Sequence, residues 1–72
     1  METKREKFVR LAEARTNKII DMIRLLGNCA NKSNYDYSEA DIQKIFTAID
    51  KELKNTKIKF SVGDFEDDKF RL

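Results

Sequence analysis

The chain contains no proline, no histidine and no tryptophan, and it has only one cysteine and two glycines among its 72 residues. Proline and glycine are the residues that destabilise helices most, so their scarcity leaves long stretches free to form helix. A single cysteine, Cys29, excludes a disulfide within the chain, and the lack of histidine excludes a zinc site built from cysteine and histidine. Stability must therefore come from helix packing or from a partner.

The sequence also lacks the motifs of an enzyme. Cys29 has no histidine to activate it as a nucleophile, and we expect it to be a small, partly buried residue. There is no glycine-rich phosphate loop and no Gly-x-Ser-x-Gly motif. The acids Asp64, Glu66, Asp67 and Asp68 lack the spacing of a calcium-binding loop. We therefore expect no catalytic activity, no metal and no cofactor.

Long apolar runs are absent as well. No segment approaches the roughly 20 apolar residues of a membrane span. The N-terminus is charged and is not followed by the apolar region of a signal peptide, and the cysteine is free. We expect a cytoplasmic protein with no membrane partner.

A chain of 72 residues forms one domain at most, and a domain of this size buries only about 60% of its unfolded surface. Oligomerisation commonly supplements so small a core. The net charge of +2 is too small to imply nucleic acid by itself. Residues 1–32 carry eight Lys/Arg and four Asp/Glu, whereas residues 33–72 carry seven and nine. The first half thus has a net positive charge and the second half a net negative charge. This difference favours packing between the two halves, within a chain or between copies, although a solvated mixed-charge surface is an open alternative.

The first long segment, residues 3–26, is predicted to be helical. Gly27 follows as the residue that ends the helix, and Asn28 comes next. The main apolar stripe recurs at spacings of three, four and seven and comprises Phe8, Ala12, Ile19, Ile23 and Leu26, widened by Val9, Thr16 and Ile20. Such a stripe is typical of a helix that faces a core.

A second apolar set lies on a neighbouring face of this helix. Leu11, Met22 and Leu25 stand there between basic residues. We expect this set to form an interface, either a dimer seam or a docking groove. The structural alternative is that the stems of the long basic side chains simply cover these three residues.

The loop, residues 27–38, is long for a helical hairpin, in which two to eight residues are usual. Asn28, Asn31 and Asn34 suit turns, since asparagine tolerates left-handed backbone and forms local hydrogen bonds. Tyr35 and Tyr37 indicate that the loop packs. They are candidate interface residues, although turn amides and a packing tyrosine also explain the composition.

The second helix is predicted over residues 39–59. Ser38 can cap its backbone N–H groups, Asp41 can reach back in a capping box, and Tyr37 and Ile42 are placed for a hydrophobic staple. Its stripe comprises Ile42, Ile45, Phe46, Ile49, Leu53 and Phe60, with Ala48 beside it and Thr56 in register. This pattern predicts one buried face.

Gly63 is predicted to break the helix and to begin an acidic and hydrophobic tail, residues 61–72. The tail contains Phe65, Phe70 and Leu72 among its acids. Disorder, a short third element, a docking peptide and an intramolecular contact with the basic face of the first helix are the open alternatives.

Direct binding of nucleic acid is the main functional alternative to protein binding. Lys4, Lys7, Arg15 and Lys18 lie on a broad basic face of the first helix, and clustered positive charge suffices for phosphate contacts. A helix-turn-helix, however, needs a much shorter turn and a compact second helix.

Segments 15–20, 23–28, 33–38 and 44–46 resemble small uncharacterised bacterial proteins that are frequent in Firmicutes and on their mobile elements. The resemblance covers roughly residues 4–60 and implies a bacterial cytoplasmic setting. It transfers no activity and no functional residue. It leaves open an accessory role on a phage or plasmid, such as inhibition of a host protein.

The sequence as a whole predicts an all-α protein. Two long antiparallel helices form a hairpin over residues 1–60, followed by the tail, residues 61–72, and two copies pair into a four-helix bundle. The expected function is that of a non-enzymatic protein-interaction or regulatory module that self-associates through Leu11, Met22 and Leu25, with Tyr35 and Tyr37 in the loop.

Overall fold

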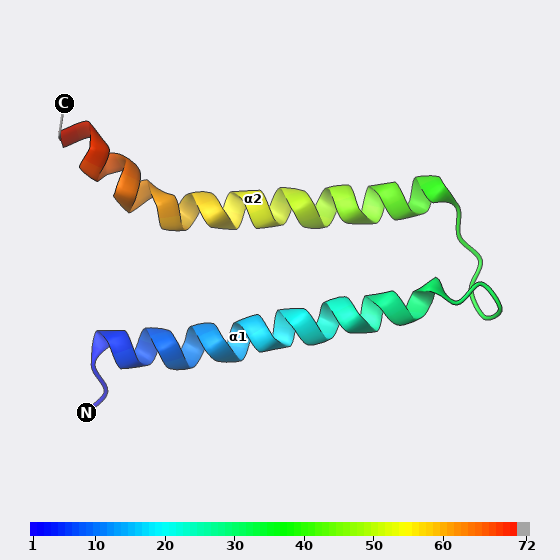
Figure 1. Ribbon diagram of the computed structural model, residues 1–72, viewed down its shortest axis with the longest axis horizontal. Helices are drawn as coiled ribbons and strands as arrows, with labels where there is room; N and C mark the ends of the chain where they lie inside the picture. Colours follow the sequence, from blue (N-terminus) through cyan, green and yellow to red (C-terminus); the bar gives the residue numbers. More distant parts are fainter. Residues whose placement is uncertain (71–72) are drawn as a thin grey trace. The chain divides into compact units, whose positions relative to one another are not determined.

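The computed structural model describes the backbone of residues 1–70 and the side chains of residues 1–61. The described part holds α1 (Lys4–Gly27), the short 3-10 helix η1 (Asn28–Ala30) and α2 (Glu39–Phe70), and it contains no strand (Figure 1). The all-helical class predicted from the sequence is thus confirmed. The chain divides into two units, Met1–Asp36 and Tyr37–Leu72, and each is described by itself. The hairpin and the four-helix bundle stay predictions.

A capping box starts α1. The Glu6 amide donates to Thr3 Oγ1 at 3.0 Å, and the Thr3 amide donates to Glu6 Oε1 at 3.1 Å. Thr3 is therefore the cap, and the first helical residue is Lys4, one position after the predicted start. The Thr-x-x-Glu spacing that marks this box is present in the sequence and is the local signal for the start of α1.

The end of α1 differs from the prediction. Gly27 is still helical, with φ −58°, and the chain passes directly into η1. The Asn28 amide donates to the carbonyls of the last turn. A tightened 3-10 turn thus provides these carbonyl oxygens with a hydrogen-bond donor, which a glycine in the left-handed conformation would otherwise do. Asn31 has φ −71°, and its side-chain Oδ1 accepts from the Ser33 amide at 3.0 Å. The asparagines at these positions act through local hydrogen bonds and not through left-handed backbone.

The capping box of α2 is confirmed. The Ser38 amide donates to Asp41 Oδ2 at 2.9 Å, the Asp41 amide donates to Ser38 Oγ at 3.2 Å, and the helix begins at Glu39. Tyr37 and Ile42 are both half-buried, and their staple contact stays a prediction.

The predicted end of α2 near residue 59 is wrong, because the helix continues through Gly63 to Phe70. An interior glycine costs a helix about 1 kcal/mol relative to alanine, which weakens a helix without ending it when no proline follows. The side chains of residues 62–72, and with them the predicted tail surface, lie outside the described residues.

Neither unit has a core of its own. None of the described side chains is buried, and large hydrophobic residues are exposed on both helices. On the main stripe of α1, Phe8 and Ile19 are 50% and 53% exposed, and on the stripe of α2, Phe46 and Phe60 are 50% and 68% exposed. Each helix thus presents an amphipathic face that lacks a partner within its own unit.

The cap of α2 gives a first test. Replacing Ser38 by alanine should lower the free energy of unfolding by about 1 kcal/mol, because the Asp41 amide loses its acceptor. Denaturant unfolding followed by circular dichroism measures this change. Ser33→Ala is the matched control, since the hydrogen bond of Ser33 uses its backbone amide and survives the substitution. Equal effects of the two substitutions would contradict the assigned cap.

Candidate interaction surfaces

The second face of α1 consists of Leu11, Met22 and Leu25. Each residue of an α-helix is rotated by about 100° from the one before it, and this rotation places the three on one side of the helix, next to the main stripe. Met22 is 59% exposed and Leu25 is 57% exposed, whereas Leu11 is half-buried. The helix therefore brings the three predicted residues onto one face, and two of them expose most of their apolar surface.

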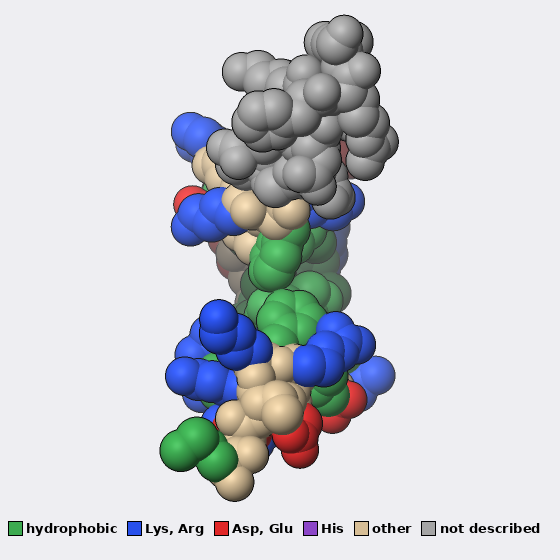
Figure 2. Space-filling model, turned by 90° about the vertical axis from the view of Figure 1, so that its left-hand side faces the viewer, with side chains coloured by type: hydrophobic (Ala, Val, Ile, Leu, Met, Phe, Trp, Pro, Cys, Tyr) green, Lys and Arg blue, Asp and Glu red, His purple; other side chains and the backbone are tan. Residues whose placement is uncertain are grey.

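Basic side chains surround this second face. Lys4, Lys7, Arg15 and Lys18 lie on the same side of α1, and none of the four forms an ion pair with a described residue. Figure 2 shows, on one side of the molecule, Lys and Arg side chains in blue and hydrophobic side chains in green. The surface is thus a mixture of unpaired cations and apolar groups, in which Arg15 and Lys18 separate Leu11 from Met22.

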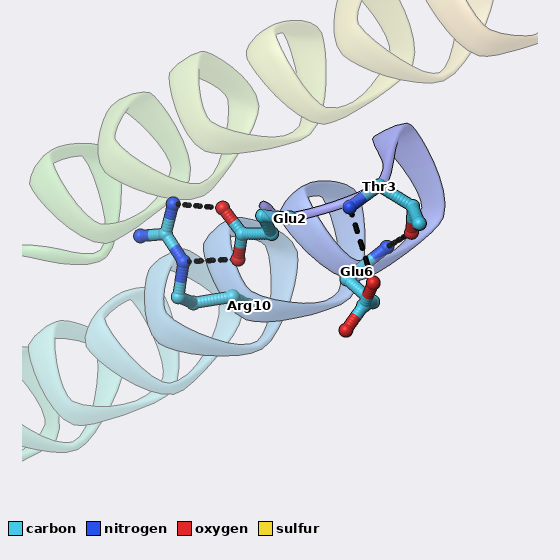
Figure 3. A network of polar contacts seen from close by, with 4 residues as sticks. All are labelled: Glu2, Thr3, Glu6 and Arg10. Carbon is cyan, nitrogen blue, oxygen red and sulfur yellow. Dashed lines mark hydrogen bonds and ion pairs between the residues drawn. The ribbon is translucent and has the colours of Figure 1, made fainter.

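The described ion pair of α1 lies elsewhere, at the N-terminus. Arg10 donates two hydrogen bonds to the Glu2 carboxylate, at 2.8 and 2.9 Å, next to the capping box of Thr3 and Glu6 (Figure 3). The bond to Arg10 lowers the pKa of Glu2 and raises that of Arg10, and the bonds to Thr3 lower the pKa of Glu6.

All four residues of this network are exposed, and the network accompanies a shallow open depression lined by Glu2, Arg5, Glu6, Val9, Arg10, Glu13, Ala14 and Asn17. The depression lies on a single helix and encloses nothing. The network therefore anchors the start of α1. Sequence reasoning missed the Glu2–Arg10 pair, because Glu2 precedes the helix and no helical spacing relates the two residues.

The loop tyrosines are separated between the two units. Tyr35 closes a turn through its amide, which donates to the Asn31 carbonyl at 3.0 Å, and its side chain is 51% exposed. Tyr37 is half-buried in the second unit. The structure gives Tyr35 the accessibility that an interface residue needs.

Cys29 is exposed, so the prediction of a partly buried cysteine is wrong. It lies in η1, and no second element of its unit covers that turn. No group of described residues has the side chains to hold a metal ion. Within the part of the chain that is described, neither helix is long and apolar enough to cross a membrane.

Comparison with protein-family models, with curated proteins and with solved structures gives no match to this chain.

The N-terminal network predicts a pH dependence. Because folding lowers the pKa of Glu2 and Glu6, their contribution to α1 is complete above the ordinary glutamate pKa and is lost as the pH falls through the lowered values. The NMR shift of the Glu6 amide, which donates to Thr3, should move toward a random-coil value over that acidic range. The combined change Glu2→Gln and Glu6→Gln should flatten the profile. An equal flattening by Glu13→Gln, an exposed control on the same helix, would contradict the assignment.

Proposed function

We propose that the chain is a non-enzymatic protein-interaction module, built as an antiparallel helical hairpin that self-associates. The observation that carries the proposal is the exposed apolar surface on both helices, together with the second face of α1. Burying a large apolar side chain completely contributes about 1.5–3 kcal/mol, so two unpaired stripes of five or more residues favour packing strongly.

The hairpin accounts for one face of each helix. It places the main stripe of α1 against the stripe of α2, and the second face of α1 then stays outside. Met22 and Leu25 are more than half exposed, and Leu25 adjoins Leu26 of the main stripe, so this face continues the apolar surface of the hairpin core. A further surface of this kind needs a further partner.

A second copy is the occupant that we propose for this face. One hairpin of this length buries a small core, and pairing of two hairpins into four helices is a common way to enlarge it. An antiparallel pairing of two α1 helices with Leu11 facing Met22 would also bring Arg15 of one copy against Lys18 of the other. A pairing with Met22 of one copy facing Leu25 of the other avoids this repulsion and gathers four apolar side chains at the symmetry axis, where the two α1 helices overlap over residues 20–27.

The biological role that fits such a module is regulatory or accessory. The setting that we propose is bacterial, where the assembled module would bind a host protein and inhibit it. Tyr35 in the loop is the exposed aromatic residue that we assign to that contact.

Light scattering across a concentration series tests self-association. The wild-type chain should have the mass of a dimer, and the combined change Met22→Glu and Leu25→Glu should give a monomer, because carboxylates would replace the apolar contact. Asn17→Glu with Gln43→Glu is the matched control, since both positions lie on polar faces and the two substitutions add the same charge as Met22→Glu with Leu25→Glu. A wild-type monomer, or a dimer that survives the first pair of substitutions, would contradict this interface.

Nucleic-acid binding is the second candidate function. It is favoured by the basic side chains that form no ion pair with any described residue, namely Lys4, Lys7, Arg15 and Lys18. Displacement of condensed counterions makes such binding steeply dependent on salt. If the candidate holds, affinity for a DNA duplex in 50 mM salt should fall about tenfold or more by 200 mM, and Arg15→Glu with Lys18→Glu should weaken it on every sequence. Fluorescence anisotropy measures both effects. Absence of binding to duplex and single strand in 50 mM salt would eliminate it.

A further inference from the structure

We propose that α1 binds the surface of an anionic lipid bilayer through one side of the helix, the basic row. The row runs along α1 in steps of three or four residues and consists of Lys4, Lys7, Leu11, Arg15, Lys18, Met22 and Leu25. Such binding uses α1 alone, so it goes beyond the proposed function and depends neither on the hairpin nor on the dimer.

Lying on a bilayer surface differs from crossing a bilayer. Crossing takes roughly 20 apolar residues in succession, and the expectation of no membrane partner rested on the absence of such a run. A helix that lies in the surface needs only apolar side chains on one side, with cations beside them. The proposed binding thus replaces that expectation with attachment at the surface.

Positive charge is segregated on the basic row. A rotation of about 100° per residue places all members of the row within about 80° of the helix circumference. Its four cations are exposed and form no ion pair with a described residue. The acids of α1 all lie outside this sector, namely Glu6, Glu13 and Asp21. The row itself therefore carries charge of one sign.

Apolar side chains share the row with the cations. Met22 and Leu25 are 59% and 57% exposed, and Leu11 is half-buried. A bilayer surface accommodates both kinds of side chain at once, because cations reach lipid phosphates while apolar side chains enter the boundary of the acyl chains. Clusters of about four to eight Lys/Arg on an amphipathic helix are typical of binding to anionic lipids. The row combines these two features on one side of α1.

The apolar stripe of α2 differs in the charges that flank it. Helical spacing places four carboxylates along its two edges, those of Glu39, Asp41, Asp50 and Glu52. Only two cations share these edges, Lys57 and Lys59. Lipid phosphates would repel the resulting negative charge. Charge thus favours α1 over α2 as the helix that binds an anionic surface.

Nucleic acid accounts for the cations of the row but not for its apolar members. Phosphate contacts need only clustered positive charge. The phosphate backbone of a nucleic acid offers the exposed side chains of Met22 and Leu25 no apolar counterpart. An anionic bilayer is therefore the partner that uses every member of the row.

Self-association and lipid binding use different parts of the row. The proposed pairing of two α1 helices overlaps over residues 20–27, so it covers Met22 and Leu25 and leaves the four cations free. On a bilayer, Met22 and Leu25 would exchange the second copy for lipid. Substitutions at Lys4 and Lys7 therefore affect lipid binding separately from the dimer.

Sedimentation with lipid vesicles tests the proposal. The wild-type chain should bind vesicles of equal parts phosphatidylcholine and phosphatidylglycerol about tenfold or more tightly than vesicles of phosphatidylcholine alone, because only the mixed vesicles are anionic. Lys4→Gln with Lys7→Gln should weaken binding to the mixed vesicles about tenfold and leave the mass of the protein in light scattering unchanged. Arg24→Gln with Lys44→Gln is the matched control, since it removes the same charge outside the row.

A tryptophan reports which side of α1 enters the bilayer, because the chain has none of its own. The fluorescence of Leu11→Trp, on the row, should shift to shorter wavelength when mixed vesicles are added, since the indole leaves water. Asn17→Trp is the control on the same helix, about 120° around from Leu11, and its fluorescence should not shift.

The contrary outcomes are distinct. Absence of binding to mixed vesicles, equal binding to both kinds of vesicle, or equal losses in the row variant and its control would overturn the proposal. Equal shifts of the two tryptophans would overturn the assigned face, and with it the proposal. Binding to a DNA duplex without binding to vesicles would assign the row to nucleic acid instead. A wild-type monomer that binds mixed vesicles through the row would contradict the dimer and support lipid binding.

Discussion

The constraint on which this protein depends is the exposed apolar stripe of each helix, which neither unit buries alone among the described residues. Each helix forms for local reasons, since both start at a capping box and both lack proline. Local reasons do not remove Phe8, Ile19, Phe46 or Phe60 from water. Isolated helices in water are marginal, and most of the stability of helices in proteins comes from packing an apolar face. Each stripe therefore needs a packing partner if its helix is to be stable.

Charge then limits the ways in which the second face of α1 can pack. The second face of α1 alternates apolar residues with Arg15 and Lys18, so it cannot meet an identical face in every alignment. A mixed seam of this kind sacrifices some stability and gains specificity, because wrong alignments place like charges together.

Much of the local structure followed from the sequence, because caps and periodicity are short-range features. Ser38 and Asp41 located the start of α2 to the residue. Gly27 and Gly63 misled the prediction of helix ends, since glycine permits a left-handed turn without requiring one, and a tightened turn or a continued helix satisfied the backbone instead. The bidentate pair of Glu2 and Arg10 had no periodic signal. Among the candidate interface residues, Met22 and Leu25 lie on one face of α1 by helical spacing, whereas the partner of that face is not a local property and leaves no signal in the spacing.

Hydrogen exchange of the unmodified chain tests the central claim most directly. If the stripes pack against each other, backbone amides along residues 8–26 and 42–60 should exchange slowly and as one cooperative group, because opening either helix exposes both stripes. Fast exchange along both helices, at the rates of isolated helical peptides, would show that the stripes stay in water and would contradict the account.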